Sequence, residues 1–189
     1  WYRESIIGCM FDRNTSPPSG APGVWRLECP ANQGAAIFAD DVALLKLEDV
    51  DEYEFMASIR LAAVGSVQVR AGYTTSNGSN SEPSSGIYFS LDGSGNWQGE
   101  CRDASTSTLV TSAVSAVGIA SLRFNYDASV PDVEFFVNGT SIGTCTTNLP
   151  AATTAGWPVK IQMVDSGNTF PWIDIDGAGY TLRWDTEAR

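Results

Sequence analysis

Two aspartates near the end of the chain, Asp174 and Asp176, have the residue type and spacing that carbohydrate chemistry uses. Alternate residues of a β-strand share one face, and the rise of a strand places these two carboxylates ~6.6 Å apart. Such a pair can supply the acid and the base or nucleophile of a glycosidase. The other interpretation is an acidic outer face on a sandwich strand, and we favour it because the chain has 22 acidic residues to form accidental pairs.

Histidine is absent from the sequence. This excludes the Ser-His-Asp and Cys-His nucleophile systems and every zinc site that needs imidazole. Carboxylates alone can still cleave glycosidic bonds, so enzymes are disfavoured but not excluded. We predict a protein that is not an enzyme, with a glycoside hydrolase acting through Asp174 and Asp176 as the alternative.

Sugar binding is the second chemistry that the sequence indicates. If the apolar residues of segments 53–62, 67–74, 86–91 and 96–102 point inward, the alternate positions carry arginines, amides and a tyrosine on one sheet face. Guanidinium forks and aromatic faces can bind sugar hydroxyls and carboxylates. The alternative is a solvated sheet laced by cross-strand ion pairs. The predicted glycan-binding residues are Arg60, Arg70, Tyr88, Gln98 and Arg102, with Trp97 at the hairpin edge.

Metal and redox sites have little support. The cysteines are too widely spaced for CxxC pairs, so they leave three disulfide pairings or buried thiols open. The loop 92–96 offers oxygen ligands to a hard cation, but it lacks a full calcium-binding pattern and suits a tight hairpin better. We predict no metal and no cofactor. The cysteines are Cys9, Cys29, Cys101 and Cys145.

The composition limits the partners. The chain has 189 residues, 43% apolar and 17% charged, and a formal net charge of −11. Such a charge repels nucleic acid and anionic lipid, and no apolar run approaches the roughly 20 residues that span a bilayer. We expect neither nucleic-acid binding nor membrane insertion. Because the sequence begins at Trp1 without a methionine, we expect either a removed preceding segment or a piece of a longer protein.

The elements that would position these residues are short strands. Apolar and β-branched runs alternate with Gly, Asn, Asp, Ser and Pro clusters, and no segment keeps a helical period. This pattern predicts an all-β fold of two packed antiparallel sheets. The turns at 92–96 and at Asn138-Gly139 predict two hairpins. The expected strands are 24–29, 35–39, 42–48, 53–62, 67–74, 86–91, 96–102, 106–112, 118–126, 132–138, 140–146, 158–164, 171–176 and 179–185.

Residues 1–23 are rich in loop-forming residues, and we predict an extended arm ahead of a sandwich domain at 24–189. Apolar residues in this arm would be wet in a free tail, so we expect the arm to lie on a neighbouring subunit or a larger particle. The alternative is that it folds back on its own sandwich as a first strand.

Several runs together resemble a concanavalin A-like lectin/glucanase jelly roll of the kind found in structural proteins of tailed bacteriophages. The resemblance covers roughly residues 35–185 and implies a two-sheet jelly-roll sandwich. Family-16-like glucanases carry Glu-x-Asp-x-x-Glu, whereas Trp172 and Gly177 or Ala178 occupy the positions of the glutamates here. The runs are Phe55–Arg60, Gly86–Ser90, Trp97, Leu122–Asp127, Phe135–Gly139 and Ile173–Asp176.

The resemblance implies a non-enzymatic virion module at the virion surface or outside the cell. It would decorate a capsid or form part of a fibre or tail, with other virion proteins and its own copies as partners. Weak binding of a host-surface glycan is expected from the lectin-like fold. The alternatives are the glycoside hydrolase above and a secreted carbohydrate-binding module.

Overall fold

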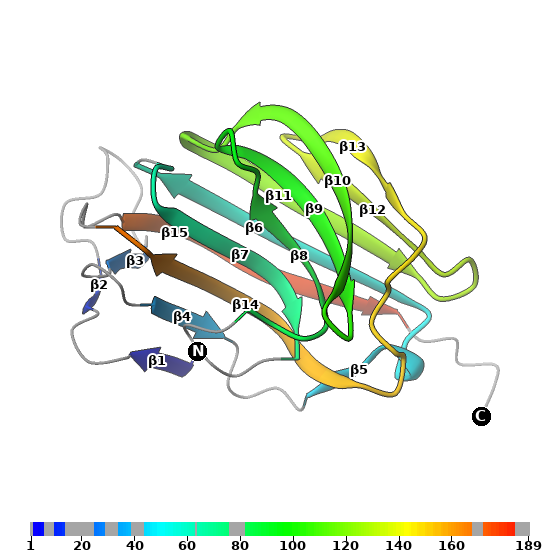
Figure 1. Cartoon of the computed structure of the whole chain (residues 1–189). Coiled ribbons are helices and arrows are strands. Elements are labelled where there is room, and N and C mark those ends of the chain that lie inside the picture. The colour runs from blue at the N-terminus through cyan, green and yellow to red at the C-terminus, as the bar shows by residue number, and fades with distance from the viewer. Residues whose placement is uncertain are drawn as a thin grey trace.

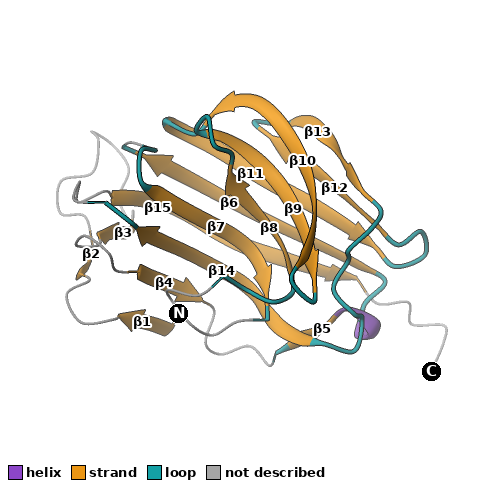
Figure 2. Ribbon diagram, in the orientation of Figure 1, coloured by secondary structure: helices purple, strands orange, loops and turns teal. Residues whose placement is uncertain are grey.

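The protein is seen in a computed structural model that describes residues 2–5, 10–13, 25–28, 34–38, 44–62, 64–75, 82–167 and 172–183. Two antiparallel sheets pack face to face (Figure 1), and one 3-10 turn, η1 (Leu47–Asp49), is the only helical element of the described part. The predicted all-β jelly-roll sandwich is confirmed. Strands account for nearly all the ordered elements in Figure 2.

Sheet A has eight strands in the order β1-β4-β14-β7-β8-β9-β10, with β5 paired to β14. Sheet B has seven strands in the order β13-β12-β11-β6-β15-β3-β2. The strands of sheet A are β1 (Tyr2–Ser5), β4 (Gly34–Phe38), β5 (Leu45–Lys46), β7 (Val67–Thr74), β8 (Gly86–Leu91), β9 (Asn96–Asp103), β10 (Thr106–Ser115) and β14 (Ala155–Asp165). Those of sheet B are β2 (Met10–Arg13), β3 (Trp25–Glu28), β6 (Glu52–Leu61), β11 (Gly118–Asp127), β12 (Asp132–Val137), β13 (Thr140–Cys145) and β15 (Trp172–Arg183).

The core lies between the sheets and is centred on Phe124 of β11. Its ring stacks on Phe55 with centroids 5.3 Å apart and meets Phe135 at 5.6 Å. Phe89 of sheet A completes the cluster at 6.4 Å from Phe124. Such aromatic pairs each add about 0.5–1.5 kcal/mol beyond the burial of their area. Phe55 and Phe89 thus face inward, as the period-2 alternation of segments 53–62 and 86–91 predicts.

Buried tyrosines connect sheet A to sheet B and fasten segments within sheet A through hydrogen bonds. Tyr53 of β6 donates its hydroxyl to the carbonyl of Pro158 in β14. Tyr73 of β7 donates its hydroxyl to the carbonyls of Thr154, at 2.7 Å, and Leu45, at 3.1 Å. Burial raises the pKa of both phenols, so they remain protonated donors.

Two predicted strands need correction. The expected strands 171–176 and 179–185 are one strand, β15, with a register shift between Ile175 and Gly177, because a bulge lets pairing with β6 continue. In the described part of the expected strand 42–48, the short strand β5 is followed directly by η1. Within the predicted arm 1–23, β1 pairs with β4 and β2 pairs with β3, which satisfies their backbone groups at the sheet edges.

Cys101 and Cys145 are free, buried thiols that face the core from opposite sheets. Cys9 and Cys29 lie outside the described residues, as do most of the predicted arm and much of the polar stretch 74–85. Within the described part, no helix has the length and apolar character needed to cross a membrane.

Candidate functional site

Polar side chains line the outward positions of four adjacent strands in sheet A. In β7, the core-facing residues Val69 and Ala71 flank Arg70, which must therefore point to the other side. The register then places Arg70 opposite Gln162 of β14. We call the whole set the sheet A polar face: Arg70, Tyr88, Ser90, Gln98, Glu100, Arg102, Lys160 and Gln162.

These side chains are far less exposed than those of an ordinary solvated sheet. Tyr88 is 0% exposed, Lys160 1% and Arg70 7%. A polar group removed from water costs free energy unless hydrogen bonds or charges compensate for it. Partners within the polar face supply part of that compensation, and they also hold the side chains in one arrangement.

Glu100 of β9 is the central acceptor of the polar face. Its carboxylate accepts hydrogen bonds from Ser107 Oγ at 2.6 Å, from Ser90 Oγ at 3.1 Å and from Arg102 Nη1 at 3.3 Å. Gln98 extends the network by donating its Nε2 to Ser90 Oγ at 3.0 Å. The network joins β8, β9 and β10 through side chains in addition to their backbone pairing.

Glu82, which lies outside the strands, bridges two arginines of the polar face. Its Oε1 is 3.0 Å from Arg102 Nη1 and 3.6 Å from Arg70 Nη2. Its Oε2 accepts a hydrogen bond from Arg102 Nη2 at 3.1 Å. The Glu82 side chain is 50% exposed, whereas both guanidiniums are largely buried. A solvent-facing carboxylate therefore covers two buried cations.

Tyr88 lies within this charged network. Burial, and next the negative charge of Glu100, raise the pKa of its phenol, so the hydroxyl stays protonated. None of the described residues gives this hydroxyl a hydrogen bond of normal geometry, and the same is true of Arg102 Nε. Both groups are buried donors with capacity to bind a ligand.

The structure brings four of the six predicted glycan-binding residues together: Arg70, Tyr88, Gln98 and Arg102. Arg60 is not among them, because β6 pairs with β11 and β15 in sheet B and not with β7. Trp97 does not lie on the sheet A polar face either. It precedes the outward Gln98, so alternation turns it into the core, where it is 0% exposed.

Three charged or polar residues of this region were not predicted from the sequence: Glu82, Lys160 and Gln162. A signal for two of them lies in the alternation of the apolar residues Val159, Ile161 and Met163, which turns Lys160 and Gln162 to the other face. What the sequence did not reveal is that β14 lies beside β7.

The two carboxylates of the predicted pair, Asp174 and Asp176, lie on sheet B and differ in their burial. Asp174 is buried and accepts two hydrogen bonds from Arg26, at 2.6 Å from Nε and 3.0 Å from Nη2. The Arg26 guanidinium also lies 4.1 Å from the ring centroid of Trp172. Asp176 is exposed beside the bulge. Both oxygens of Asp174 are thus held by one arginine, as in a structural ion pair.

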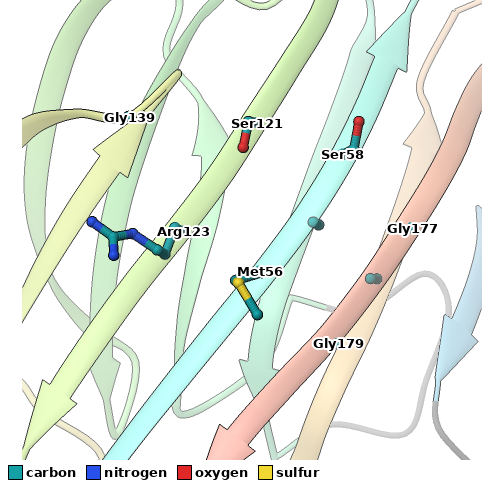
Figure 3. Close-up of a pocket in the computed structure, with 9 residues that line it drawn as sticks. Met56, Ser58, Ser121, Arg123, Gly139, Gly177 and Gly179 are labelled. Carbon is teal, nitrogen blue, oxygen red and sulfur yellow. The ribbon is translucent and has the colours of Figure 1, made fainter.

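A shallow hollow of about 470 Å³ lies on the outer face of sheet B (Figure 3). Side chains of Met56 and Arg123 border it on neighbouring strands, while Gly177 and Gly179 add none. Arg123 is engaged elsewhere, 4.0 Å from the Phe136 ring centroid and 3.4 Å from a Glu54 oxygen. The hollow offers few free hydrogen-bonding groups to a polar ligand.

The loop considered as a calcium site is a hairpin. Asp92 Oδ1 accepts hydrogen bonds from the backbone nitrogens of Ser94 and Asn96, at 2.8 and 2.7 Å. These bonds lower the pKa of the Asp92 carboxyl. Positive φ angles at Asn138 and Gly139 form the second predicted hairpin. Among the described residues, no group of three acidic or cysteine side chains is placed to hold a metal ion.

Most of the sequence matches a known protein family. The family model described as "SO2946-like, C-terminal domain" matches residues 21–176. The chain belongs to this family. One solved structure carries the name of the family: the protein of unknown function SO2946 from Shewanella oneidensis MR-1. It is 15% identical to this chain, with a TM-score of 0.64 over 99% of this chain and 80% of that one.

Two further solved structures share the two-sheet fold of this SO2946-like domain. The carbohydrate recognition domain of Emp47p is 9% identical, with a TM-score of 0.64 over 96% of this chain and 91% of that one. A Bacillus licheniformis β-glucanase is 12% identical, with a TM-score of 0.56 over 86% and 79%. No curated protein matches the sequence. These likenesses establish the fold, and none of the named proteins has a bacteriophage context.

Proposed function

We propose that this SO2946-like domain binds a saccharide on the sheet A polar face. The observation that carries the proposal is the convergence of buried, mutually hydrogen-bonded polar side chains on one outer sheet face. Saccharide hydroxyls require several donors and acceptors at fixed positions, and this face provides guanidinium, carboxylate, amide and phenol groups together. A carbohydrate recognition domain with the same fold gives independent support.

The residues would act in distinct ways. Arg70 and Arg102 present guanidinium groups that can donate two hydrogen bonds each to neighbouring sugar oxygens. Glu100 is fixed by Ser90 and Ser107 and can accept from a sugar hydroxyl with its remaining lone pairs. The Tyr88 hydroxyl lies beside Glu100 but makes no hydrogen bond of normal geometry with the described residues, so it remains a candidate donor. Binding then orders few side chains, because the protein already holds them.

The glycoside hydrolase alternative would act on sheet B, through Asp174 and Asp176. A β-glucanase with the same fold is the observation in its favour. The bidentate contact of Arg26 with Asp174 argues against it, because the guanidinium already holds both carboxylate oxygens and leaves neither free to meet a glycosidic oxygen. We therefore propose that the domain binds a saccharide and does not cleave it.

The virion setting stays a prediction from the sequence. The solved structures named above do not bear on capsid decoration, a fibre or tail position, virion partners, self-association or a location outside the cell. A secreted carbohydrate-binding module would use the same polar face, so the proposed binding does not depend on the setting.

A glycan array with a multivalent form of the protein tests the proposal. Single sites of this kind bind near the millimolar range, about −4 kcal/mol, so many copies are needed for a signal. Arg70→Ala and Tyr88→Phe should reduce binding about tenfold or more. Arg60→Ala, an arginine on the outer face of sheet B, is the matched control and should leave it unchanged. Binding that survives both sheet A substitutions would overturn the proposal.

A further inference from the structure

We infer that the sheet A polar face selects acidic saccharides, and that Glu82 occupies the place of the sugar carboxylate when no ligand is bound. This inference rests on the proposed saccharide binding and specifies its ligand class. Its starting point is the contact of a single glutamate with two arginines, Arg70 and Arg102.

The charge balance of the face favours an anion. Its outward strand positions carry three cations, Arg70, Arg102 and Lys160, and one carboxylate, Glu100. Glu82 adds a second negative charge from outside the strands. The two guanidiniums that Glu82 contacts are cationic groups in a chain whose formal net charge is −11. A ligand carboxylate in place of Glu82 would keep the same balance.

The two carboxylates of the region are held differently. Glu100 is 6% exposed and accepts hydrogen bonds from three side chains, so it is fixed in the network. Glu82 is 50% exposed and contacts arginines alone among the side chains of the described residues. Ion pairs that face solvent are weak and easily exchanged for another anion. Glu82 is therefore the carboxylate that a ligand can replace.

Unused donors lie next to this position. Arg102 Nε and the Tyr88 hydroxyl are buried, and the described residues leave both without a normal hydrogen bond. Glu82 already engages Nη1 and Nη2 of Arg102, so a larger anion could use those positions together with Nε. A carboxylate attached to a sugar ring adds hydroxyl oxygens beside the carboxylate, and these can pair with other polar groups of the face. A neutral sugar has no carboxylate to replace Glu82, so Arg70 and Arg102 would keep their contacts with Glu82.

The experiment compares matched acidic and neutral ligands on the full chain. The probes are oligogalacturonate against its carboxyl-reduced form, and sialyllactose against lactose, measured by titration calorimetry and by competition with a multivalent form. The variants are Glu82→Gln and, as a matched control, Glu54→Gln, which removes a glutamate paired with Arg123 on sheet B. Thermal denaturation of each variant confirms that it folds.

At least one acidic probe should bind more tightly than its neutral counterpart, and added salt should weaken that binding. Glu82→Gln should strengthen acidic binding about two- to fivefold, because it removes the competing carboxylate, and Glu54→Gln should not change it. Equal binding of acidic and neutral probes, or weaker acidic binding by Glu82→Gln, overturns the inference and leaves saccharide binding standing. Absence of binding to all four probes and to a glycan array overturns both.

Discussion

The outer faces of the two sheets carry the same kinds of residues, but they hold them differently. On sheet A, Glu100 and Arg102 are largely buried and share partners across three strands. On sheet B, Glu52 and Arg183 form an ion pair whose side chains are 53% and 73% exposed. Both faces arise from the same period-2 alternation. Burial and shared partners, and not residue type, distinguish the candidate site from an ordinary charged surface.

One carboxylate on sheet B is an exception to this difference in burial. Asp174 is as buried as the polar face of sheet A, but its carboxylate is satisfied by Arg26 alone. A buried ion pair of this kind can maintain register between β15 and β3 without any ligand. A functional site requires, in addition, groups left with unused hydrogen-bonding capacity, and Tyr88 and Arg102 provide them on sheet A.

The largest effect is expected from removing the central acceptor of the polar face. Glu100→Ala removes three hydrogen bonds to a buried carboxylate, from Ser90, Ser107 and Arg102, so the free energy of unfolding should fall by about 3 kcal/mol although Arg102 keeps Glu82. Glu52→Ala, which breaks an exposed pair, should cost at most about 1 kcal/mol. Urea denaturation of both variants measures the difference. Equal losses would show that the two faces are energetically alike.

Asp174→Asn should lower the free energy of unfolding by about 2 kcal/mol, since it weakens two charged hydrogen bonds from Arg26. Asp176→Asn should stay within about 0.5 kcal/mol, because Asp176 is exposed. The same two variants, assayed for new reducing ends on a polysaccharide panel, test the glycosidase alternative. Wild-type turnover abolished by Asp174→Asn would favour an enzyme over our proposal.

Glycines should also respond differently on the two sheets. A Cβ at Gly86 of β8 would lie 2.7 Å from the Tyr73 carbonyl oxygen and 2.9 Å from the Tyr88 ring, so Gly86→Ala should cost about 1–3 kcal/mol. A Cβ at Gly177 would meet no atom within 4 Å, so Gly177→Ala should change stability by less than about 0.5 kcal/mol. Melting temperatures of the two alanine variants compare the faces directly. A destabilising Gly177→Ala would mean that the hollow is more constrained than its geometry indicates.

The smallest effect is expected from acid, and it should be similar in both sheets. Hydrogen bonds lower the pKa of Asp92 in the β8–β9 hairpin and of Asp127 at the end of β11 below the ordinary value of 3.8. Their contribution to stability is therefore present above about pH 3.8 and is lost as the pH falls through the lowered values. Asp92→Asn and Asp127→Asn should each flatten the decline in urea midpoint between about pH 5 and pH 2. A decline as steep as that of the wild type would contradict this.

The sequence was sufficient for the fold because alternation and turn chemistry act locally. It was sufficient for part of the site because β7, β8 and β9 follow one another in the chain and in sheet A, so the outward phase of Arg70, Tyr88 and Arg102 could be read together. It failed for Arg60 because the short connection at 62–66 passes from sheet B to sheet A without a distinctive residue pattern. Lys160 was missed for the related reason that its strand comes to β7 from far along the chain.

The alternation that exposes Glu100 and Arg102 to a ligand turns the residue between them, Cys101, into the core. Burial raises the pKa of this thiol, so alkylating reagents in solution find neither access nor thiolate while the sheets are packed. Its labelling rate would then follow the transient opening of the sandwich. A saccharide held by the flanking residues binds only the closed form and should slow that labelling. Strand β9 thus carries its own chemical reporter of occupancy on the side opposite the ligand.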